Sequence, residues 1–94
     1  MEIKIRNIRE SDFKQLLDLF KEFAEFENLP ERMNNSIERM AEEKEYLKGF
    51  VAETNDKRIV GYVTCFFTYY TWFGKCMYID DLYVKAEFRA KGVG

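Results

Sequence analysis

The sequence contains no histidine, so a mechanism that needs an imidazole base or an imidazole metal ligand is excluded. Its two cysteines, Cys65 and Cys76, have neither the number nor the spacing of a disulfide framework or a zinc site. No apolar run is long enough to span a bilayer, and the first residues do not have the pattern of a signal peptide. We therefore expect a cytoplasmic protein that binds no metal and no membrane.

The chain also lacks an excess of positive charge. Fifteen basic residues stand against 17 acidic ones, which gives a formal net charge of -2. Proteins that bind nucleic acid by neutralising phosphates are normally basic, so this class is disfavoured. A single proline and five glycines mark no domain boundary, and 94 residues suffice for one small domain. Nine phenylalanines and six tyrosines indicate that this domain is globular.

Hydrophobic periodicity predicts an α+β domain. Ile3 and Ile5 alternate with charged residues, a period of two that is typical of a strand. Apolar residues then recur at helical spacing and predict a helix over residues 13–26, with Ser11 or Asp12 as its N-cap. This helix is expected to bury its apolar face in the core.

The rest of the chain predicts a short helix and three strands. Residues 35–46 form a second helical segment, in which Asn35 and Glu38 have the spacing of a variant capping box. Runs of β-branched and aromatic residues predict strands at residues 50–53, 59–67 and 75–84. The expected order is therefore β-α-α-β-β-β, followed by a glycine-containing loop.

Two adjacent carboxylates, Asp80 and Asp81, lie inside the last predicted strand. Aspartate is depleted in strand interiors, and a buried charge without a partner is costly. Because side chains alternate along a strand, we expect the two to point to opposite faces. One interpretation is structural, with one aspartate solvated and the other paired with a lysine or arginine. The other is that they belong to a functional site.

A basic segment with two glycines follows this strand and ends the sequence. Such a segment either forms a nest of backbone N–H groups that holds phosphate or makes an ordinary turn. The combination of a strand with carboxylates, a polar spacer and Arg-x-x-Gly-x-Gly is more specific than either part. The segment consists of Arg89, Ala90, Lys91, Gly92, Val93 and Gly94.

This combination resembles the cofactor-binding motif of the GCN5-related N-acetyltransferase superfamily, in which Gln or Arg, two residues, Gly, one residue and Gly or Ala follow the central strand. Several other segments resemble the diamine, thialysine and spermidine/spermine acetyltransferases. They are Phe23-Ala24-Glu25-Phe26-Glu27, Ile59-Val60-Gly61-Tyr62, Phe67-Thr68-Tyr69, Trp72-Phe73-Gly74-Lys75 and Tyr78-Ile79-Asp80-Asp81-Leu82-Tyr83-Val84. The resemblance implies the N-terminal half of this family's α/β sandwich, ending in the pyrophosphate loop.

The resemblance also implies acetyl transfer from acetyl-CoA to a primary amine of a small diamine, polyamine or lysine-like substrate. An alkylammonium has a pKa near 10.4, so a carboxylate must take its proton before the amine attacks. Asp80 stands where the family has this catalytic base, and Glu27 and Asp81 match positions that face the substrate. Tyr70 also matches a substrate position, but the polyamine enzymes have aspartate there. This departure favours a shorter diamine or a lysine-like amine.

Acetyl-CoA binding is implied for the end of the chain. The backbone of Leu82, Tyr83 and Val84 would pair with the pantetheine arm as an added strand does. The backbone amides of residues 89–94 would hold the pyrophosphate, and the side chain of Arg89 would add positive charge.

In the superfamily this motif lies near the middle of the domain. We therefore expect residues 1–94 to be a single partial domain that lacks its C-terminal half and is inactive or nearly so. Its uncovered sheet edge is expected to cause self-association, for example as a homodimer. The alternative is a non-catalytic module for acyl-CoA binding or dimerisation. Trp72 and Phe73, next to a glycine, have three possible uses, a wall of the substrate site, a dimer contact or burial, of which we expect burial.

Overall fold

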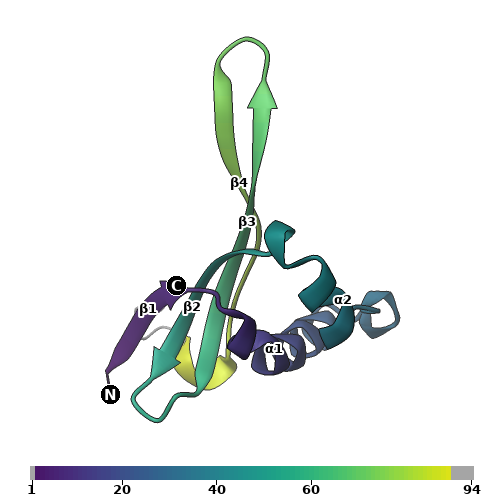
Figure 1. The fold of residues 1–94 in the computed structure, drawn as a ribbon. Helices are drawn as coiled ribbons and strands as arrows, with labels where there is room; N and C mark the ends of the chain where they lie inside the picture. Colours follow the sequence, from purple (N-terminus) through teal and green to yellow (C-terminus); the bar gives the residue numbers. More distant parts are fainter. Residues whose placement is uncertain (1, 90–94) are drawn as a thin grey trace.

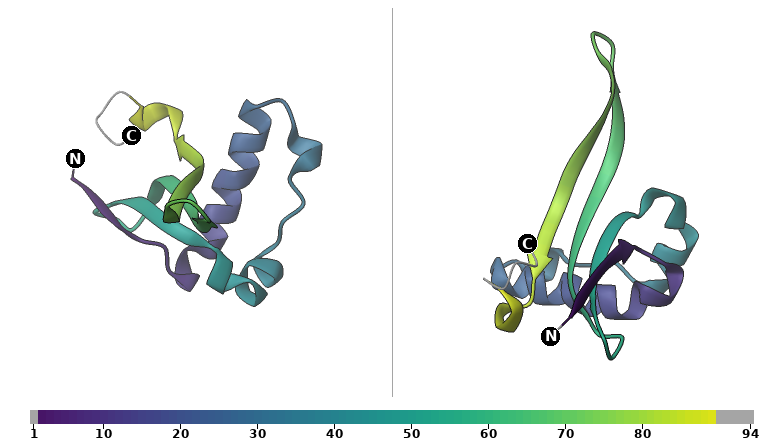
Figure 2. Two further views of the ribbon diagram at one scale, coloured as in Figure 1. Left: turned by 90° about the horizontal axis from the view of Figure 1, so that it is seen from above. Right: turned by 90° about the vertical axis from the view of Figure 1, so that its left-hand side faces the viewer.

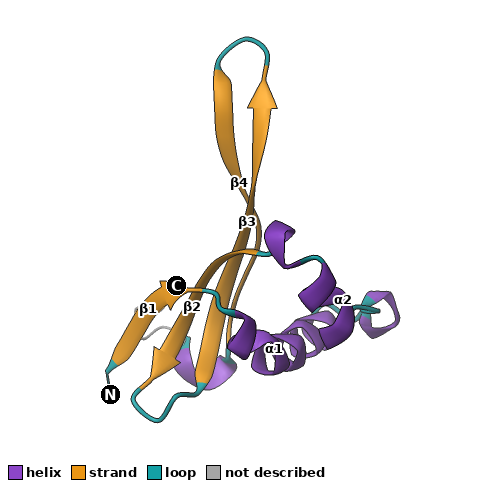
Figure 3. Ribbon diagram, in the orientation of Figure 1, coloured by secondary structure: helices purple, strands orange, loops and turns teal. Residues whose placement is uncertain are grey.

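The computed structural model describes residues 2–89, and within them a single antiparallel sheet has the strand order β1-β2-β3-β4. The strands are β1 (Ile3–Asn7), β2 (Lys48–Thr54), β3 (Ile59–Tyr70) and β4 (Gly74–Val84). Two helices, α1 (Phe13–Phe26) and α2 (Ile37–Glu42), come between β1 and β2 and lie on the same side of the sheet (Figure 1). Figure 3 shows the separation into a sheet layer and a helical layer. The predicted α+β class and the predicted order of elements are confirmed.

α1 has the predicted bounds and one of the two predicted N-caps, whereas α2 differs from the prediction at its N-terminus. α1 follows a short 3-10 turn, and Asp12 is its N-cap without a capping hydrogen bond from its side chain. α2 begins one residue later than the capping box predicts. Ser36 is the N-cap, and its hydroxyl accepts a hydrogen bond from the backbone N–H of Arg39 at 3.1 Å. The Asn35 side chain instead accepts the backbone N–H of Ser36 at 2.8 Å.

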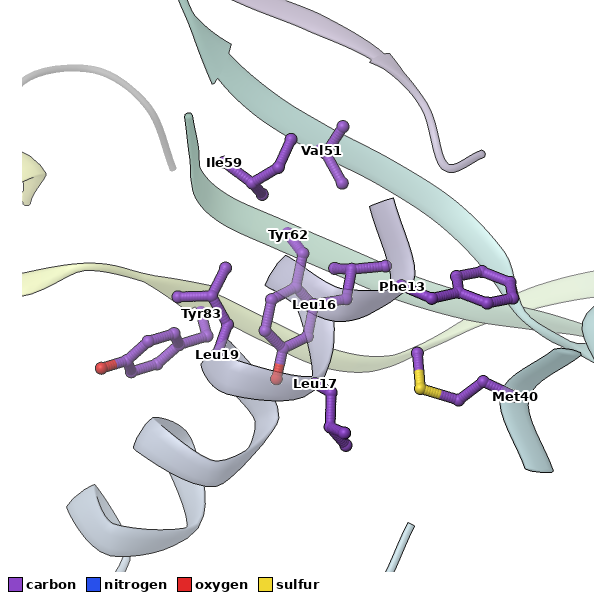
Figure 4. Packing of buried hydrophobic residues seen from close by; sticks show 9 residues of the cluster. All are labelled: Phe13, Leu16, Leu17, Leu19, Met40, Val51, Ile59, Tyr62 and Tyr83. Carbon is purple, nitrogen blue, oxygen red and sulfur yellow. The ribbon is translucent and has the colours of Figure 1, made fainter. Parts of the chain in front are cut away.

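The main core lies between α1 and the sheet. α1 supplies four of its buried residues, which contact large side chains from the middle of the strands, as Figure 4 shows. The ring of Phe20 packs edge to face against that of Tyr62 in β3, with the ring centres 5.0 Å apart. The ring of Phe23 stacks on that of Tyr83 in β4, with the ring centres 5.1 Å apart. The cluster consists of Phe13, Leu16, Leu17, Leu19, Met40, Val51, Ile59, Tyr62 and Tyr83. This packing places the C-terminal end of α1 beside β4.

The opposite face of the sheet carries a much smaller cluster. Ala52 and Val60 are buried there under Phe88, which comes from a 3-10 turn (Ala86–Phe88) after β4. Elsewhere on this face apolar side chains remain open: Phe50 is 42% exposed and Leu82 is 55% exposed. The described residues therefore cover one face of the sheet with helices and leave much of the other accessible.

β3 and β4 continue beyond the rest of the sheet as a two-stranded arm. β2 pairs with β3 only as far as Cys65, whereas β3 and β4 remain paired up to their connecting turn. Figure 2 shows this arm, which we call the β3–β4 hairpin, projecting away from the helices. At its tip Trp72 is 95% exposed and Phe73 is 70% exposed. The prediction that these two residues are buried is wrong, because within residues 2–89 no element outside the hairpin packs against the turn.

A buried ion network joins β1, β2 and the start of α1. The guanidinium of Arg6 donates two hydrogen bonds of 2.8 Å to the carboxylate of Asp12 and two of 3.1 Å to that of Glu53. Asp12 also accepts the backbone N–H of Arg9 at 2.8 Å. Burial alone would raise the pKa of Asp12, but the hydrogen bonds from Arg6 and Arg9 outweigh it and hold that pKa below its usual value. The hydrogen bonds from Arg6 also lower the pKa of Glu53.

Candidate functional site

A cavity of about 640 Å³ lies between α1, the segment that follows it, and the middle of β3 and β4. Its floor is aromatic, because Phe20 and Phe23 of α1 and Tyr62 of β3 all line it, and the rings of Phe20 and Tyr62 are in contact. Charged side chains from several elements reach the same space. The acidic ones are Glu27, Asp80 and Asp81.

The two aspartates line the same cavity because β4 contains a β-bulge. In the pairing of β3 with β4, Thr64 lies opposite Asp81 and Cys65 lies opposite Ile79, so Asp80 is an extra residue without a partner. Such a bulge breaks the alternation of side chains and re-aims the residues next to it. The prediction that Asp80 and Asp81 point to opposite faces is therefore wrong. They form a carboxylate pair at one site.

The third carboxylate comes from a different element. Glu27 is the C-cap of α1, which the contacts of Phe23 with Tyr83 hold beside β4. Asp81 is the more enclosed aspartate, and its pKa is raised by burial first, then by the negative charges of Asp80 and Glu27. The site therefore combines an exposed carboxylate, a partly buried one and a third across the cavity. Such a set attracts an ammonium group.

Tyr62 is a residue of this site that the sequence did not single out. Its side chain is 3% exposed, and its hydroxyl has no hydrogen-bond partner among the described residues. Burial and the nearby charge of Asp81 raise its pKa, so it is a neutral phenol at any physiological pH. In Figure 4 its ring stands off the sheet toward α1. The only feature of the sequence that could have pointed to Tyr62 is its hydroxyl group, which stands in a strand segment of otherwise apolar residues, Ile59-Val60-Gly61-Tyr62-Val63.

Tyr70 does not belong to the cavity. It lies on the β3–β4 hairpin, where its ring stacks on Phe73 at 5.0 Å and its hydroxyl meets that of Tyr78. The structure therefore brings Glu27, Asp80 and Asp81 together and leaves Tyr70 outside.

Three of the predicted cofactor-binding residues, Leu82, Tyr83 and Val84, lie at the C-terminal end of β4, which is the edge strand of the described sheet. An edge strand leaves one row of backbone groups for an extended ligand to pair with. The side chain of Tyr83 points into the core, and its hydroxyl donates a 2.6 Å hydrogen bond to Glu22; burial and this contact raise its pKa to about 12. Leu82 and Val84 keep their side chains on the other, more open face.

The side chain of Arg89 packs against the end of α1 and the end of β4. Its Nε donates a 2.8 Å hydrogen bond to the carbonyl of Val84, and its guanidinium lies 4.8 Å from the ring centre of Phe26 and 5.3 Å from that of Tyr83. In this arrangement the side chain joins α1 to the end of β4. The remaining predicted residues of the pyrophosphate loop, Ala90, Lys91, Gly92, Val93 and Gly94, lie outside the described residues.

The described residues were also compared with the requirements of a metal site and of a membrane-spanning helix. Within residues 2–89, no group of three or more cysteine, aspartate or glutamate side chains has the geometry to hold a metal ion. Neither described helix has the length and apolar character needed to cross a membrane.

Comparisons with known proteins agree on one family. The model of the acetyltransferase (GNAT) family matches residues 13–94. The thialysine N-epsilon-acetyltransferase of Mus musculus is 32% identical over 102 residues, which cover 97% of this chain and 60% of the mouse protein. The spermidine/spermine N(1)-acetyltransferase-like protein 1 of Homo sapiens is 30% identical over 101 residues, with 97% of this chain and 14% of the human protein covered.

A solved structure is similar in fold. The predicted acetyltransferase of Clostridium acetobutylicum, described with acetyl-CoA, has a TM-score of 0.71 and 17% sequence identity, covering 98% of this chain and 66% of its own. The chain spans about 60% of the length of the thialysine enzymes it matches.

Proposed function

Because the chain belongs to the acetyltransferase (GNAT) family, we propose that it carries the amine-binding site and part of the acetyl-CoA site of a cytoplasmic N-acetyltransferase. The proposed acceptor is a primary amine of a small diamine, polyamine or lysine-like compound. The observation that carries this proposal is the gathering of Glu27, Asp80 and Asp81 on one cavity beside β4. The chain spans 60% of the length of the mouse relative, so the catalytic activity of the whole protein is itself a proposal.

The carboxylates have two tasks in the proposed reaction. Asp80, the unpaired residue of the bulge, accepts a proton from the bound ammonium, directly or through a water molecule. Asp81 and Glu27 hold the cation in the cavity and orient it. The free amine then forms a C–N bond to the acetyl carbon, the C–S bond breaks, and the second proton of the nitrogen neutralises the leaving thiolate, so the products are the acetamide and the thiol of coenzyme A.

Acetyl-CoA supplies the activated acetyl group as a thioester. The backbone of Leu82, Tyr83 and Val84 is proposed for its pantetheine arm, because β4 is the edge strand of the described sheet; the arm would replace the hydrogen bond that Arg89 donates to the carbonyl of Val84. The backbone of residues 89–94 is proposed for the pyrophosphate. The side chain of Arg89 has a different task, since its contacts with Phe26 and Tyr83 hold α1 against the strand.

The first test measures amine binding and acetyl transfer together. We expect the chain to bind 1,5-diaminopentane in a calorimetric titration, and the double change Glu27→Gln with Asp81→Asn to weaken binding at least about 10-fold, because two charge-assisted contacts are lost. The change Glu38→Gln, at an exposed acid of α2 outside the cavity, is the control and should leave binding unchanged. Coenzyme A release from acetyl-CoA by a full-length version, with diamines, lysine analogues and spermidine as acceptors, reports transfer.

Two results would contradict parts of this proposal. If no small amine binds and only protein N-termini are acetylated, the acceptor class is wrong while the family stands. If the double variant binds the diamine as tightly as the unchanged chain does, the cavity is not the amine site.

We also propose that the chain self-associates through the β3–β4 hairpin and the β4 edge. Support comes from the exposed aromatic side chains on this arm, since large exposed apolar patches mark interaction surfaces. Sedimentation velocity should show a dimer, and changing both Trp72 and Phe73 to serine should weaken it at least about 10-fold, as expected for aromatic anchors. Tyr46→Ser, an exposed tyrosine away from the hairpin, is the control. A monomer at high concentration would refute self-association.

A further inference from the structure

The outer edge of β3 has no partner over its last residues. β2 pairs with β3 only as far as the pair of Lys48 with Cys65. β3 continues to Tyr70, and among the described residues only β4 pairs with this continuation, so the hairpin projects alone (Figure 2). In an antiparallel pair, alternate residues turn their N–H and C=O groups away from the partner strand. The edge from Phe66 to Tyr70 therefore offers a row of hydrogen-bonding groups to another strand.

This edge lacks the features with which proteins usually protect an edge strand. Proline and charged side chains keep such edges from pairing with other chains. The segment from Phe66 to Tyr70 contains four aromatic residues and one threonine, with no proline and no charge. Aromatic and β-branched residues favour strands. The segment is therefore suited to accept an added strand, which is one of the common ways in which proteins bind an extended peptide.

A second cavity, with a volume of about 490 Å³, lies where β2 separates from β3 and the free edge begins. Much of its wall is apolar. Phe67 of β3 and Met77 of β4 line it, and each is 56% exposed. Phe13 of α1 and Leu47, the residue before β2, also line it. An apolar side chain of a strand that pairs with β3 can therefore be buried here.

The second cavity is also bordered by more positive than negative charge. Its basic residues are Arg9, Lys44 and Lys48, and its only acid is Glu10. Glu10 pairs with Lys44 at 3.4 Å, whereas Arg9 and Lys48 make no ion pair within residues 2–89. Lys48 is the first residue of β2, so its charge lies at the end of the free edge. An acidic group complements the charges at this point.

We propose that the outer edge of β3 and the second cavity bind an extended peptide of a partner protein, and that the C-terminal end of this peptide is acidic. The peptide adds to β3 as an antiparallel strand, which pairs slightly more strongly than a parallel one. An antiparallel strand runs in the same direction as β2 and meets Lys48 with its C-terminal end. Its acidic end then lies beside Arg9 and Lys48, and an apolar side chain enters the cavity.

Three fluorescently labelled hexapeptides test the proposal by anisotropy, at a concentration at which sedimentation velocity shows a monomer. The first alternates valine and threonine and ends in two glutamates. The second ends in two glutamines and an amide, and the third is the first with methylated backbone nitrogens. We expect the first to bind at least about 10-fold more tightly than the others, because it alone combines negative charge with a backbone that can pair with β3.

Changes at Arg9 assign the binding to the second cavity, because Arg9 lines this cavity only, whereas Lys48 also lines the first. Arg9→Gln should weaken the acidic peptide about 3-fold or more, and the charge reversal Arg9→Glu about 10-fold or more. Neither should change the affinity for the uncharged peptide. Lys14→Gln, at an exposed residue of α1 that lines neither cavity, removes one positive charge and is the matched control. Circular dichroism melting of each variant shows that it is folded.

Four results would overturn the proposal. The edge binds no such peptide if none of the three binds. If the methylated peptide binds as tightly as the first, the cavity takes an anion and no strand is added. If both Arg9 variants bind the acidic peptide as the unchanged chain does, its acidic end lies elsewhere. If dimerisation of the chain, and not the peptide, protects the amides of residues 66–70 from hydrogen exchange, a second copy covers this edge.

Discussion

Replacing Asp80 by asparagine is expected to lower the rate of acetyl transfer at neutral pH about 10²- to 10⁴-fold, the range for loss of a general base. The amide cannot accept the proton of the bound ammonium, so the amine stays protonated and does not attack. The loss should shrink as the pH approaches the amine's own pKa of about 10.4, where free amine becomes available without a base. Steady-state coenzyme A release, measured from pH 6 to 10 with a version that also contains the C-terminal half, gives both the rate and its pH dependence, because residues 1–94 alone are expected to be inactive or nearly so.

Asp81→Asn is the matched control for this change, because the bulge places both carboxylates at one cavity. Asp81 is partly buried and its pKa is raised by burial and by neighbouring acids, which suits a group that binds the cation. We expect this variant to raise KM more than it lowers kcat. If instead Asp80→Asn leaves the rate near neutral pH unchanged, Asp80 is not the base, whatever Asp81→Asn does.

Removing the guanidinium of Arg6 should have the largest effect on stability. Arg6→Met leaves the carboxylate of Asp12, a residue 3% exposed, without its two strongest hydrogen bonds and its counter-charge. Breaking a buried ion pair from one side costs about 3 kcal/mol, the lower end of the range, because the side chain of Arg6 keeps 11% of its surface exposed. Urea denaturation at pH 7 measures the free energy of unfolding.

The pH dependence of the network gives a second readout. Asp12 and Glu53 have lowered pKa values in the folded chain, so their contribution is complete above their unfolded values, about 3.9 and 4.3. It is lost as the pH falls through the folded values. The difference between Arg6→Met and the unchanged chain should therefore be largest at neutral pH and shrink in acid. A difference that stays constant down to pH 2 would contradict this account.

An exposed ion pair provides the control for the Arg6 prediction. Lys44 and Glu10 are 3.4 Å apart, with side chains 60% and 59% exposed. Solvent screens such a pair, so Lys44→Met should cost less than about 1 kcal/mol.

Local pattern predicted most of the secondary structure. The stripe of apolar residues in α1 buries Phe13, Leu16 and Leu17, as helical spacing requires. The errors lie where a distant contact or a competing polar group decides the outcome. β3 extends to Tyr70, beyond the predicted end at residue 67, because β4 pairs with it past the last residue that pairs with β2. Ser36, and not the predicted Asn35, is the N-cap of α2, because both residues are polar and both precede the helix.

The functional site was predictable in part. The motif and its resemblance singled out Asp80, Asp81 and Glu27, and the structure brings all three to one cavity. It leaves Tyr70 on the hairpin and adds Tyr62. Tyr62 is one of six tyrosines and carries no local sign that it lines the cavity, because its place there depends on the packing of β3 against α1.

The sequence by itself determined the kinds of elements, the α+β class and the family, since these depend on the period of apolar residues and on motifs within short segments. With no histidine available, it also directed the search for a base to carboxylates. Only the tertiary structure decided that Asp80 and Asp81 share a site. Their orientation depends on a bulge, which arises from the register of β4 against β3 across a long hairpin. Strand alternation is a local rule, whereas register is a long-range pairing that the residues of one strand do not encode alone.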